Sequence, residues 1–331
     1  MKPITVFFLA LIAAVATTSA AQASEFTISE LPTPAGLPRC NASRINDAGQ
    51  VVGGCWGHNL SDERAVLWEN GKVIVLPVLP GFTSSWASSI SSTGQIVGYA
   101  TGSAGFQAML WSNGSVQNLG LLPGTFTSFA SGINSSGVIV GFSDSQAVEW
   151  IGGQILDFGG YNGDRPSAIS DKGVFVGFGV INQGDVGGAI IDVGSPGAPL
   201  RYLAQSLFGS ADDINNFDEV AGFNRVTFTS PNIPWTWHYG RFTYLPFLAG
   251  SNSCEAVGIN RLGDVVGFCE PNSATLWRRG VVQNLGSLIQ ANSHWELQAA
   301  TTLNSSDEIV GDGKYRDVEE AFIIQPTHRL R

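Results

Sequence analysis

One phrase recurs along this chain and limits what the chain can fold into. An Ile or Leu is followed by Asn or Ser, two further residues, usually a Gly, one more residue, an apolar pair and a closing Gly. Its copies begin, at spacings of 45, 43, 36, 45, 45 and 44 residues, at Ile45, Ile90, Ile133, Ile169, Ile214, Ile259 and Leu303. The closing glycines keep the same intervals at Gly53, Gly98, Gly141, Gly177, Gly222, Gly267 and Gly311. A repeat of this length indicates an array of similar supersecondary units.

Each copy of the phrase predicts a β-hairpin whose four-residue loop contains a type I turn. Asn or Ser at the first loop position caps the turn, and the fourth position needs a positive φ, which Gly accepts most easily. Asp218 and Asp307 replace that Gly in two copies, and Asp tolerates the left-handed region better than most residues. We interpret these loops as structural.

A second phrase follows most copies and ends in Trp, as in Ala65-Val66-Leu67-Trp68. The equivalent tryptophans are Trp111 and Trp277, with weaker copies ending in Trp150 and Trp237. A tight turn with Gly and another short strand come next, so each unit has four strands, here called a, b, c and d. A Trp that recurs once per unit indicates packing between sheets rather than a ligand platform.

Units of this size with four strands are typical of propeller blades. The segment Phe26–Leu31 reads as a d strand without a preceding a, b or c, and the last unit, Leu303–Gln325, lacks a d strand. We therefore predict an all-β, seven-bladed β-propeller of four-stranded antiparallel blades, its last blade closed by the N-terminal strand. The domain would span 24–326, followed by a tail at 327–331. Only a weak helical stripe, from Tyr202 to Phe208, departs from the strand pattern.

The pattern Ile-Asn-x-x-Gly-x-Val-Val-Gly, then Ala-x-Leu-Trp, then x-x-Leu-Gly resembles the HAF repeat of predicted extracellular bacterial proteins. The resemblance covers nearly all of residues 25–325. Only Ala321-Phe322 approaches the His-Ala-Phe phrase of that family, with Glu320 where His would stand. The resemblance implies an extracellular repeat protein and brings no catalytic residues.

The first residues have the layout of a secretory signal peptide. Lys2 is followed by an apolar run, Ile4–Val15, and by small residues that end at Ala21-Gln22-Ala23. Cleavage after Ala23 would leave 308 residues with a net charge of −11, because Lys2 is the only charged residue removed. We expect a secreted or periplasmic protein; an uncleaved membrane anchor is the alternative, but the apolar run is short for a span. The acidic balance argues against nucleic-acid binding and against anionic membrane surfaces.

The four cysteines keep the register of the repeat. Cys40 and Cys254 lie five residues before their repeat Ile, and Cys55 and Cys269 lie ten after it. In a hairpin in which residue 45 faces residue 50, residue 40 faces residue 55, within reach of a disulfide. We predict the bonds Cys40–Cys55 and Cys254–Cys269; a metal site built from all four is the alternative.

Topology predicts two unlike faces. The short a–b and c–d turns share one, here called the uniform face, and the d–a and b–c loops share the other, the variable face, where binding sites are usual. Aromatic residues outside the repeat fall in the variable loops: Trp56, Phe82, Trp86, Phe126, Phe129, Trp235 and Trp295. We predict a ligand patch led by Trp56, Trp86 and Trp295 near the closure seam, with Trp235, His58 and His294 as further candidates. The alternative is that these side chains only pack against neighbouring loops.

No catalytic or phosphate-binding motif is present, and none of the four histidines recurs with the repeat. We therefore expect a monomeric, non-catalytic binding module for a saccharide or a protein partner, without a cofactor or a metal site, although a calcium site stays open. The alternative is a carbohydrate-active hydrolase or lyase that uses two carboxylates of the variable face. The acidic residues expected there are Asp62, Glu63, Asp144, Asp185, Glu255 and Glu270.

Overall fold

The structure is a computed structural model that describes residues 24–57, 62–158, 163–179, 189–192, 201–203, 208–227 and 229–327. The predicted signal segment, 1–23, and the end of the tail, 328–331, lie outside these ranges. Among the described residues, no helix is long and apolar enough to cross a membrane.

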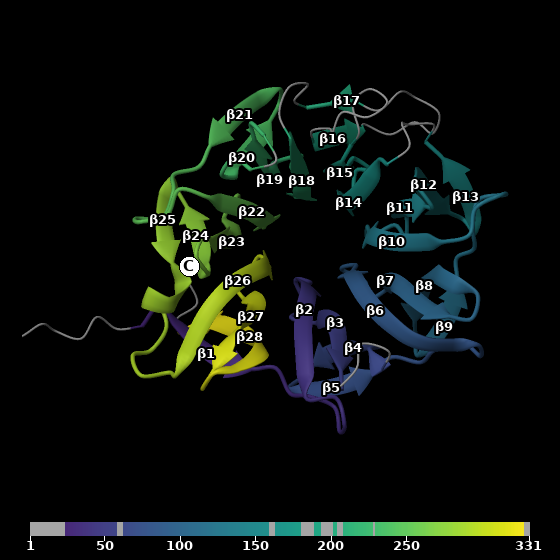
Figure 1. Cartoon of the computed structure of the whole chain (residues 1–331), viewed down its shortest axis with the longest axis horizontal. Coiled ribbons are helices and arrows are strands. Elements are labelled where there is room, and N and C mark those ends of the chain that lie inside the picture. Colours follow the sequence, from purple (N-terminus) through teal and green to yellow (C-terminus); the bar gives the residue numbers. More distant parts are fainter. Residues whose placement is uncertain are drawn as a thin grey trace, which may run out of the picture.

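Strand pairing divides the described chain into seven four-stranded antiparallel sheets around a central axis, and each sheet is one blade (Figure 1). The strands of blades 1 to 3 are β2 (Arg39–Ile45), β3 (Val51–Trp56), β4 (Arg64–Glu69), β5 (Lys72–Val75), β6 (Phe82–Ile90), β7 (Ile96–Gly102), β8 (Gly105–Ser112), β9 (Ser115–Asn118), β10 (Ser128–Ile133), β11 (Ile139–Ser143), β12 (Gln146–Ile151) and β13 (Gln154–Asp157). Those of blades 4 to 6 are β14 (Arg165–Ile169), β15 (Phe175–Phe178), β16 (Ala189–Asp192), β17 (Arg201–Tyr202), β18 (Phe208–Ile214), β19 (Val220–Arg225), β20 (Ile233–His238), β21 (Arg241–Tyr244), β22 (Cys254–Ile259), β23 (Val265–Cys269), β24 (Ser273–Arg278) and β25 (Val281–Asn284). Blade 7 contains β26 (Trp295–Leu303), β27 (Ile309–Tyr315), β28 (Val318–Pro326) and β1 (Phe26–Glu30).

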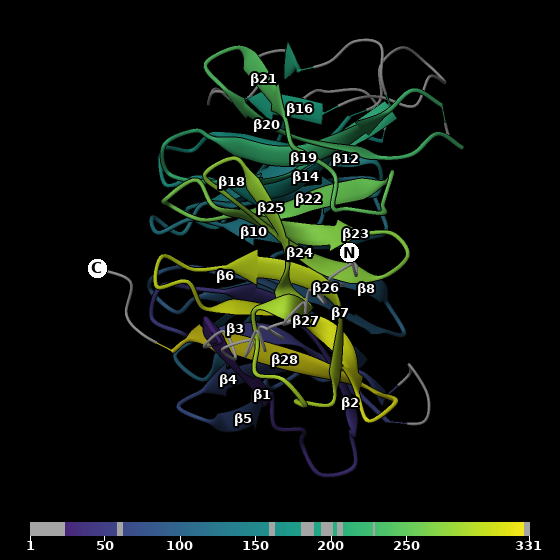
Figure 2. The ribbon, with the colours of Figure 1, turned by 90° about the vertical axis from the view of Figure 1, so that its left-hand side faces the viewer.

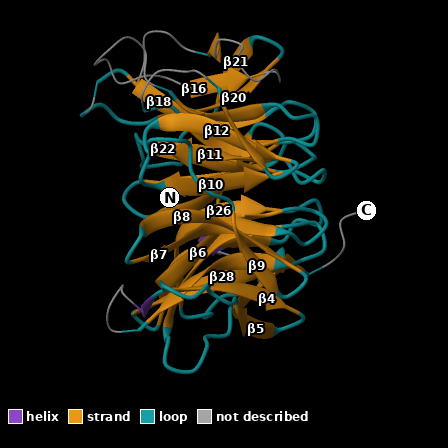
Figure 3. Cartoon of the chain, turned by 90° about the vertical axis from the view of Figure 1, so that its right-hand side faces the viewer, coloured by secondary structure: helices purple, strands orange, loops and turns teal. Residues whose placement is uncertain are grey.

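The first strand of each blade lies nearest the axis (Figure 1), and in side view the loops gather at the two ends of the strands (Figures 2 and 3). The ring closes where β1 pairs antiparallel with β28, from Phe26 opposite Pro326 to Glu30 opposite Phe322. The prediction that the N-terminal strand completes the last blade is confirmed. This pairing covers the outer edge of β28, and an unpaired edge is a route to aggregation.

A short 3-10 helix, Leu285–Ser287, interrupts the strand pattern between blades 6 and 7. The weak helical stripe expected from Tyr202 to Phe208 is wrong at both ends, because Tyr202 ends β17 and Phe208 begins β18.

Where the first residue of an a–b turn is Asn, its side chain both caps the turn and bonds to the next blade. The Asn46 side-chain oxygen accepts hydrogen bonds from the backbone N–H groups of Ala48 and Gln50, at 3.1 and 3.0 Å, which confirms the predicted cap. Its Nδ2 donates to the carbonyl oxygen of Ser91 in the next blade, at 3.0 Å. The equivalent bonds to the next blade are made by Asn134, Asn215, Asn260 and Asn304, the last of which reaches back to Asn46. This asparagine belt ties adjacent blades together at the uniform face.

The fourth residue of every a–b turn has a positive φ, including Asp218 at 65° and Asp307 at 62°. The predicted positive φ at the fourth turn position is therefore confirmed, including in the two copies that have Asp in place of Gly.

Every a–b hairpin also contains a β-bulge, which the sequence analysis missed. In blade 1 the register shifts between Ala42 and Arg44, so that Ser43 is the extra residue. Beside the bulge the two strands approach so closely that a Cβ on Gly53 would lie 2.0 Å from the Asn41 carbonyl oxygen. The closing glycines of the other six blades meet a carbonyl oxygen at 1.9 to 2.2 Å in the same way. The repeat therefore ends in Gly because only Gly fits there.

The core consists of separate apolar clusters, most of which span two neighbouring blades. The recurring tryptophans lie in them, and Trp68, Trp111 and Trp277 each donate a hydrogen bond through Nε1 to a proline carbonyl oxygen before their own a strand, at 2.7 to 2.8 Å. Their predicted role in packing between sheets is confirmed.

Both predicted disulfides are present. The Cys40–Cys55 and Cys254–Cys269 bonds join directly opposite residues of the a–b hairpins of blades 1 and 6. No cysteine is left free, so the alternative of a four-cysteine metal site is excluded.

The asparagine belt predicts a graded loss of stability at Asn260. Asn260→Ser keeps a capping oxygen but loses the bond to the Asn304 carbonyl, and we expect it to lower the free energy of unfolding by about 1 kcal/mol. Asn260→Ala also leaves the turn N–H groups without their acceptor and should cost about 2 kcal/mol. Urea denaturation measures both.

Ser170 supplies the control for this series, because its hydroxyl at the equivalent position has no hydrogen-bond partner in the structure. Ser170→Ala should be nearly neutral. Equal stability of Asn260→Ala and the unchanged chain would show that the belt does not hold the blades.

Candidate functional site

A layer of side chains connects consecutive blades in the half of the ring toward the variable face. In blades 1 to 3, the residue after the closing glycine on strand b packs on the strand-a residue that stands four before the repeat Ile in the next blade. These contacts join Gly54 with Trp86, Tyr99 with Phe129, and Phe142 with Arg165. The bulge lies at the same place in the hairpins of blades 2 and 3. The aromatic side chains at these two positions, Tyr99 and Phe129, therefore meet between the two blades.

The layer widens into a continuous group of rings on blades 2 and 3. Ring centroids lie 5.7 Å apart for Tyr99 and Phe106, 5.1 Å for Phe106 and Phe129, and 4.8 Å for Phe129 and Phe142. Trp86 borders the group as the cross-strand neighbour of Tyr99. Phe106 is 40% exposed, whereas Tyr99, Phe129 and Phe142 are half-buried.

One further ring projects beside this group. Phe126, in the d–a loop that enters blade 3, is 79% exposed, and its carbonyl oxygen lies next to Gly105. We call Tyr99, Phe106, Phe126, Phe129 and Phe142 the aromatic surface.

The loop that carries Phe126 is held from below by Asp144 and Ser143. The Asp144 carboxylate accepts hydrogen bonds from the backbone N–H of Phe126 and from the backbone N–H and hydroxyl of Thr127, the latter two at 2.8 Å. Ser143 Oγ contacts the Thr125 hydroxyl at 2.6 Å. Burial opposes ionisation of Asp144, but these hydrogen bonds outweigh it and lower the pKa of the carboxyl. Asp144 is thus a structural anchor rather than a free catalytic acid.

Charged groups of opposite sign lie at the two ends of the aromatic surface. The Arg165 guanidinium carbon is 4.7 Å from the ring centroid of Phe142. At the other end, burial and the nearby Glu63 carboxylate raise the pKa of Tyr99 to about 12, and burial also raises the pKa of Glu63. Tyr99 therefore keeps its hydroxyl proton at neutral pH and remains a hydrogen-bond donor.

Each of the three tryptophans expected to lead the ligand patch lies in a strand of a different blade. Trp86 lies inside β6 and covers Gly54, where a Cβ would be 2.2 Å from the indole ring. Trp295 begins β26, with its ring 5.3 Å from Tyr315 and 5.9 Å from Phe322. Trp56 ends β3, half-buried. No ring contact joins any two of these three described residues, and a ligand patch near the closure seam stays a prediction.

Trp235 is not in a variable loop. It lies inside β20, is 0% exposed, and packs at 4.9 Å on Phe242 and against Gly222. It occupies the position that Val66 holds in blade 1, two residues before the recurring Trp, and therefore fills the core. His58 lies outside the described residues, and His294 is exposed with a φ of 63°.

Two of the candidate carboxylates come together at blades 5 and 6. Glu255, half-buried on β22, accepts a hydrogen bond from Asn232 at 2.6 Å, and burial followed by repulsion from Glu270 raises its pKa. The interior of the ring adds Asp212, the extra residue of the blade 5 bulge, which the sequence analysis did not select. Burial raises the pKa of Asp212 to about 7, and Glu255 contributes to the shift.

The other acidic candidates do not join this group. Asp62 is exposed, Glu63 and Asp144 lie beside the aromatic surface, and Asp185 lies outside the described residues. In the part of the chain that the structure describes, no group of three His, Cys, Asp or Glu side chains is arranged to hold a metal ion.

The sequence contains a signal for the aromatic surface that the analysis did not use. The residue after the closing glycine is aromatic in five of the seven copies: Tyr99, Phe142, Phe178, Phe223 and Phe268. On blades 2 and 3 that position is joined by strand-a and loop aromatics, and there it forms a partly exposed surface.

Trp235 should determine stability. Trp235→Ala removes a fully buried indole and should lower the free energy of unfolding by about 3–5 kcal/mol. Trp235→Phe should cost much less, because the Trp235 Nε1 makes no hydrogen bond in the structure. Equilibrium urea denaturation measures both changes; a Trp235→Ala chain of unchanged stability would contradict the buried position.

Asp212 should make stability depend on pH. Its pKa of about 7 in the folded chain lies above its ordinary value of 3.8. As pH rises, the Asp212 carboxyl therefore ionises in the unfolded chain at a lower pH than in the folded chain. The free energy of unfolding consequently falls as pH rises from about 4 to 7. Asp212→Asn cannot ionise, and we expect it to be more stable than the unchanged chain at pH 8 by about 2 kcal/mol and similar to it at pH 4. Denaturation at both pH values measures the difference; identical pH profiles would show that Asp212 ionises normally.

Comparison with known proteins supports the β-propeller fold but does not assign the chain to a family. No protein-family model matches the chain, and no curated protein matches it. Among solved structures, the β-propeller domain of the trilobed protease from Pyrococcus furiosus aligns with a TM-score of 0.56 at 13% identity, over 88% of this chain and 97% of that one. An oligogalacturonate lyase in complex with manganese gives 0.59 at 9%, over 92% and 94%. YCF48 bound to D1 peptide gives 0.55 at 9%, over 92% and 96%. The chain is thus similar to β-propellers that include both enzymes and binding proteins.

Proposed function

We propose that this chain is an exported, non-catalytic binding propeller that holds its ligand on the aromatic surface of blades 2 and 3. The observation that carries the proposal is Phe126, a 79% exposed ring on a loop whose backbone is fixed by Asp144. An exposed aromatic side chain is costly in water, and a preorganised one loses little entropy when it binds. Central aromatic anchors of this kind dominate binding energy at interfaces.

Saccharides and protein segments both suit this surface. Aromatic rings stack on the apolar face of a sugar or enclose an apolar side chain. The Tyr99 hydroxyl, Glu63 and Arg165 supply hydrogen-bonding groups around the rings, as small-molecule and peptide sites commonly do. YCF48, which has the same fold, was solved with a bound peptide. The two disulfides are consistent with an oxidising compartment, which supports export.

A screen of neutral and acidic polysaccharides and of unstructured peptides against the full chain should find a ligand for this surface. Phe126→Ala should weaken that ligand at least tenfold and leave the melting temperature unchanged, because the ring is exposed and its backbone contacts remain. Calorimetry and thermal unfolding measure the two effects.

Phe217→Ala is the matched control, since Phe217 is also an exposed Phe but lies in an a–b turn of the uniform face. It should leave this affinity unchanged. If Phe126→Ala binds as tightly as the unchanged chain, the aromatic surface is not the site.

A hydrolase or lyase is the second candidate, and the group formed by Asp212, Glu255 and Glu270 favours it. A carboxyl with a pKa near 7 is suited to general acid or base catalysis at neutral pH. Release of reducing ends or unsaturated products from the polysaccharide panel, abolished in Asp212→Asn, would establish this activity. The absence of any cleavage would remove it.

A further inference from the structure

The uniform face, interpreted from sequence as structural, exposes large apolar side chains on two adjacent blades. The third position of the a–b turn holds Phe217 in blade 5 and Leu262 in blade 6, which are 48% and 66% exposed. The other five copies carry small or polar residues there: Ala48, Thr93, Ser136, Lys172 and Ser306. Folding of the turn therefore does not require an apolar residue at this position.

Tyr239 adds a third exposed ring in the c–d turn of blade 5. It is 80% exposed and has a φ of 46°, in the left-handed region that bulky residues avoid. The equivalent turns of blades 1 and 2 use Asn70 and Asn113 at nearly the same φ, and Asn accepts this conformation readily. The equivalent turn of blade 6 holds Arg279 at a φ of 52°, so the turn imposes this conformation and the exposed Tyr239 ring is the feature that distinguishes blade 5.

These residues form one patch. His238 donates a hydrogen bond from Nε2 to the Phe217 carbonyl oxygen at 3.1 Å, and its ring centroid lies 3.9 Å from that of Tyr239. The Arg261 guanidinium carbon is 5.9 Å from the Phe217 ring centroid, which brings the turn that holds Leu262 beside Phe217. We call Phe217, Tyr239 and Leu262 the turn patch.

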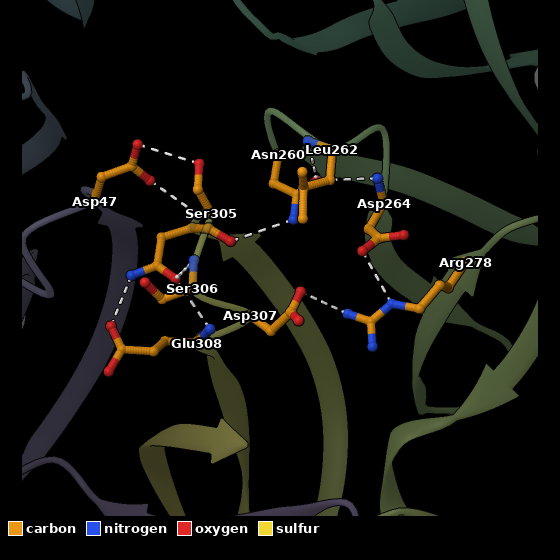
Figure 4. A network of polar contacts seen from close by, with 10 residues as sticks. Asp47, Asn260, Leu262, Asp264, Arg278, Ser305, Ser306, Asp307 and Glu308 are labelled. Atoms are coloured by element: carbon orange, nitrogen blue, oxygen red, sulfur yellow. Dashed lines mark hydrogen bonds and ion pairs between the residues drawn. The ribbon is translucent and has the colours of Figure 1, made fainter. Parts of the chain in front are cut away.

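The turn patch borders an acidic hollow in the same face. Leu262 lines this hollow together with residues of blades 1, 2, 5, 6 and 7, and its lining includes eight acidic and two basic side chains. One of those bases, Arg278, is already paired with Asp264 and Asp307 at 2.9 and 2.7 Å (Figure 4). The acidic lining residues are Glu25, Glu30, Asp47, Glu69, Glu219, Asp264, Asp307 and Glu308. The hollow therefore presents a negative potential next to apolar anchors.

We propose that the uniform face of blades 5 and 6 is a second docking surface, for a cationic polypeptide segment with aliphatic or aromatic side chains. The apolar side chains of the segment would cover Phe217, Tyr239 and Leu262, and its lysine or arginine residues would lie along the acidic hollow. The negative charge of the hollow favours a positively charged partner, and the exposed rings supply the central apolar contact. This surface lies on the face opposite to the aromatic surface and does not depend on the ligand proposed there.

The test uses the full chain and three fluorescent eight-residue peptides, with alternating Lys and Leu, Glu and Leu, or Lys and Ser. We expect the Lys–Leu peptide to bind at least tenfold more tightly than the other two, and to weaken as salt rises because charge contributes. The double variant Phe217→Ser and Leu262→Ser installs the residues that blades 3 and 7 use at these positions. It should bind the Lys–Leu peptide at least fivefold more weakly with unchanged melting temperature.

Tyr239→Asn separates a functional role from a structural one. Relief of the left-handed strain should raise the melting temperature by about 1–3 °C, while loss of the ring weakens the Lys–Leu peptide. Phe126→Ala, on the opposite face, should not alter this affinity. No binding of the Lys–Leu peptide, equal binding of the Glu–Leu peptide, or full affinity in the double variant would overturn the proposal.

Discussion

The ring depends on one close contact, in which the backbone of each closing glycine lies against a carbonyl oxygen of strand a beside the bulge. A side chain at Gly53 or at its equivalents would meet that oxygen at about 2 Å. The bulge increases the local twist of the hairpin, and the contact fixes how far strand a departs from strand b. In blades 1 to 3 this geometry brings the residue after the glycine, Gly54, Tyr99 or Phe142, against the following blade. The aromatic layer is a consequence of this backbone constraint, and the aromatic surface is the part of the layer that solvent reaches.

The repeat predicted strand order, turn chemistry and disulfides because each depends on local spacing. The cysteine pairing was right although its assumed register was not: Ile45 faces Val51, and the bulge at Ser43 restores the register before Cys40 meets Cys55. A bulge leaves no period in the sequence, so it was missed. Trp235 was misplaced for a different reason. It lies opposite the closing glycine in strand c, a core position that holds Val66 in blade 1 and Phe322 in blade 7. The residue type at this position varies between blades, so Trp235 looks like an aromatic residue outside the repeat. The group at Asp212 depends on contacts between blades and could not be read from one strand.

The two faces differ in how they acquire exposed apolar groups. On the variable face, loop and strand aromatics accumulate on an aromatic position that the repeat already provides, and Asp144 fixes the loop that exposes Phe126. On the uniform face the turns are held by the asparagine belt, which leaves their third position free of structural demands. The side chain at that position varies without disturbing the cap. Because one buried asparagine supplies the hydrogen bonds that such a turn needs, its exposed residues can be substituted one at a time without loss of the turn.

The closure by β1 has a consequence for the connectivity of the chain. Every other sheet pairs strands that follow one another, whereas Thr27 and Gln325 meet across a separation of 298 residues. The last blade therefore has the highest contact order in the molecule and must wait for both termini, while the other blades assemble from local hairpins. Since the two ends lie side by side in one sheet, joining them and opening the chain at another exposed connection would give a circular permutant with the same strand pairings. In such a permutant blade 7 would form from neighbouring segments, and the long-range step would move to whichever blade was cut.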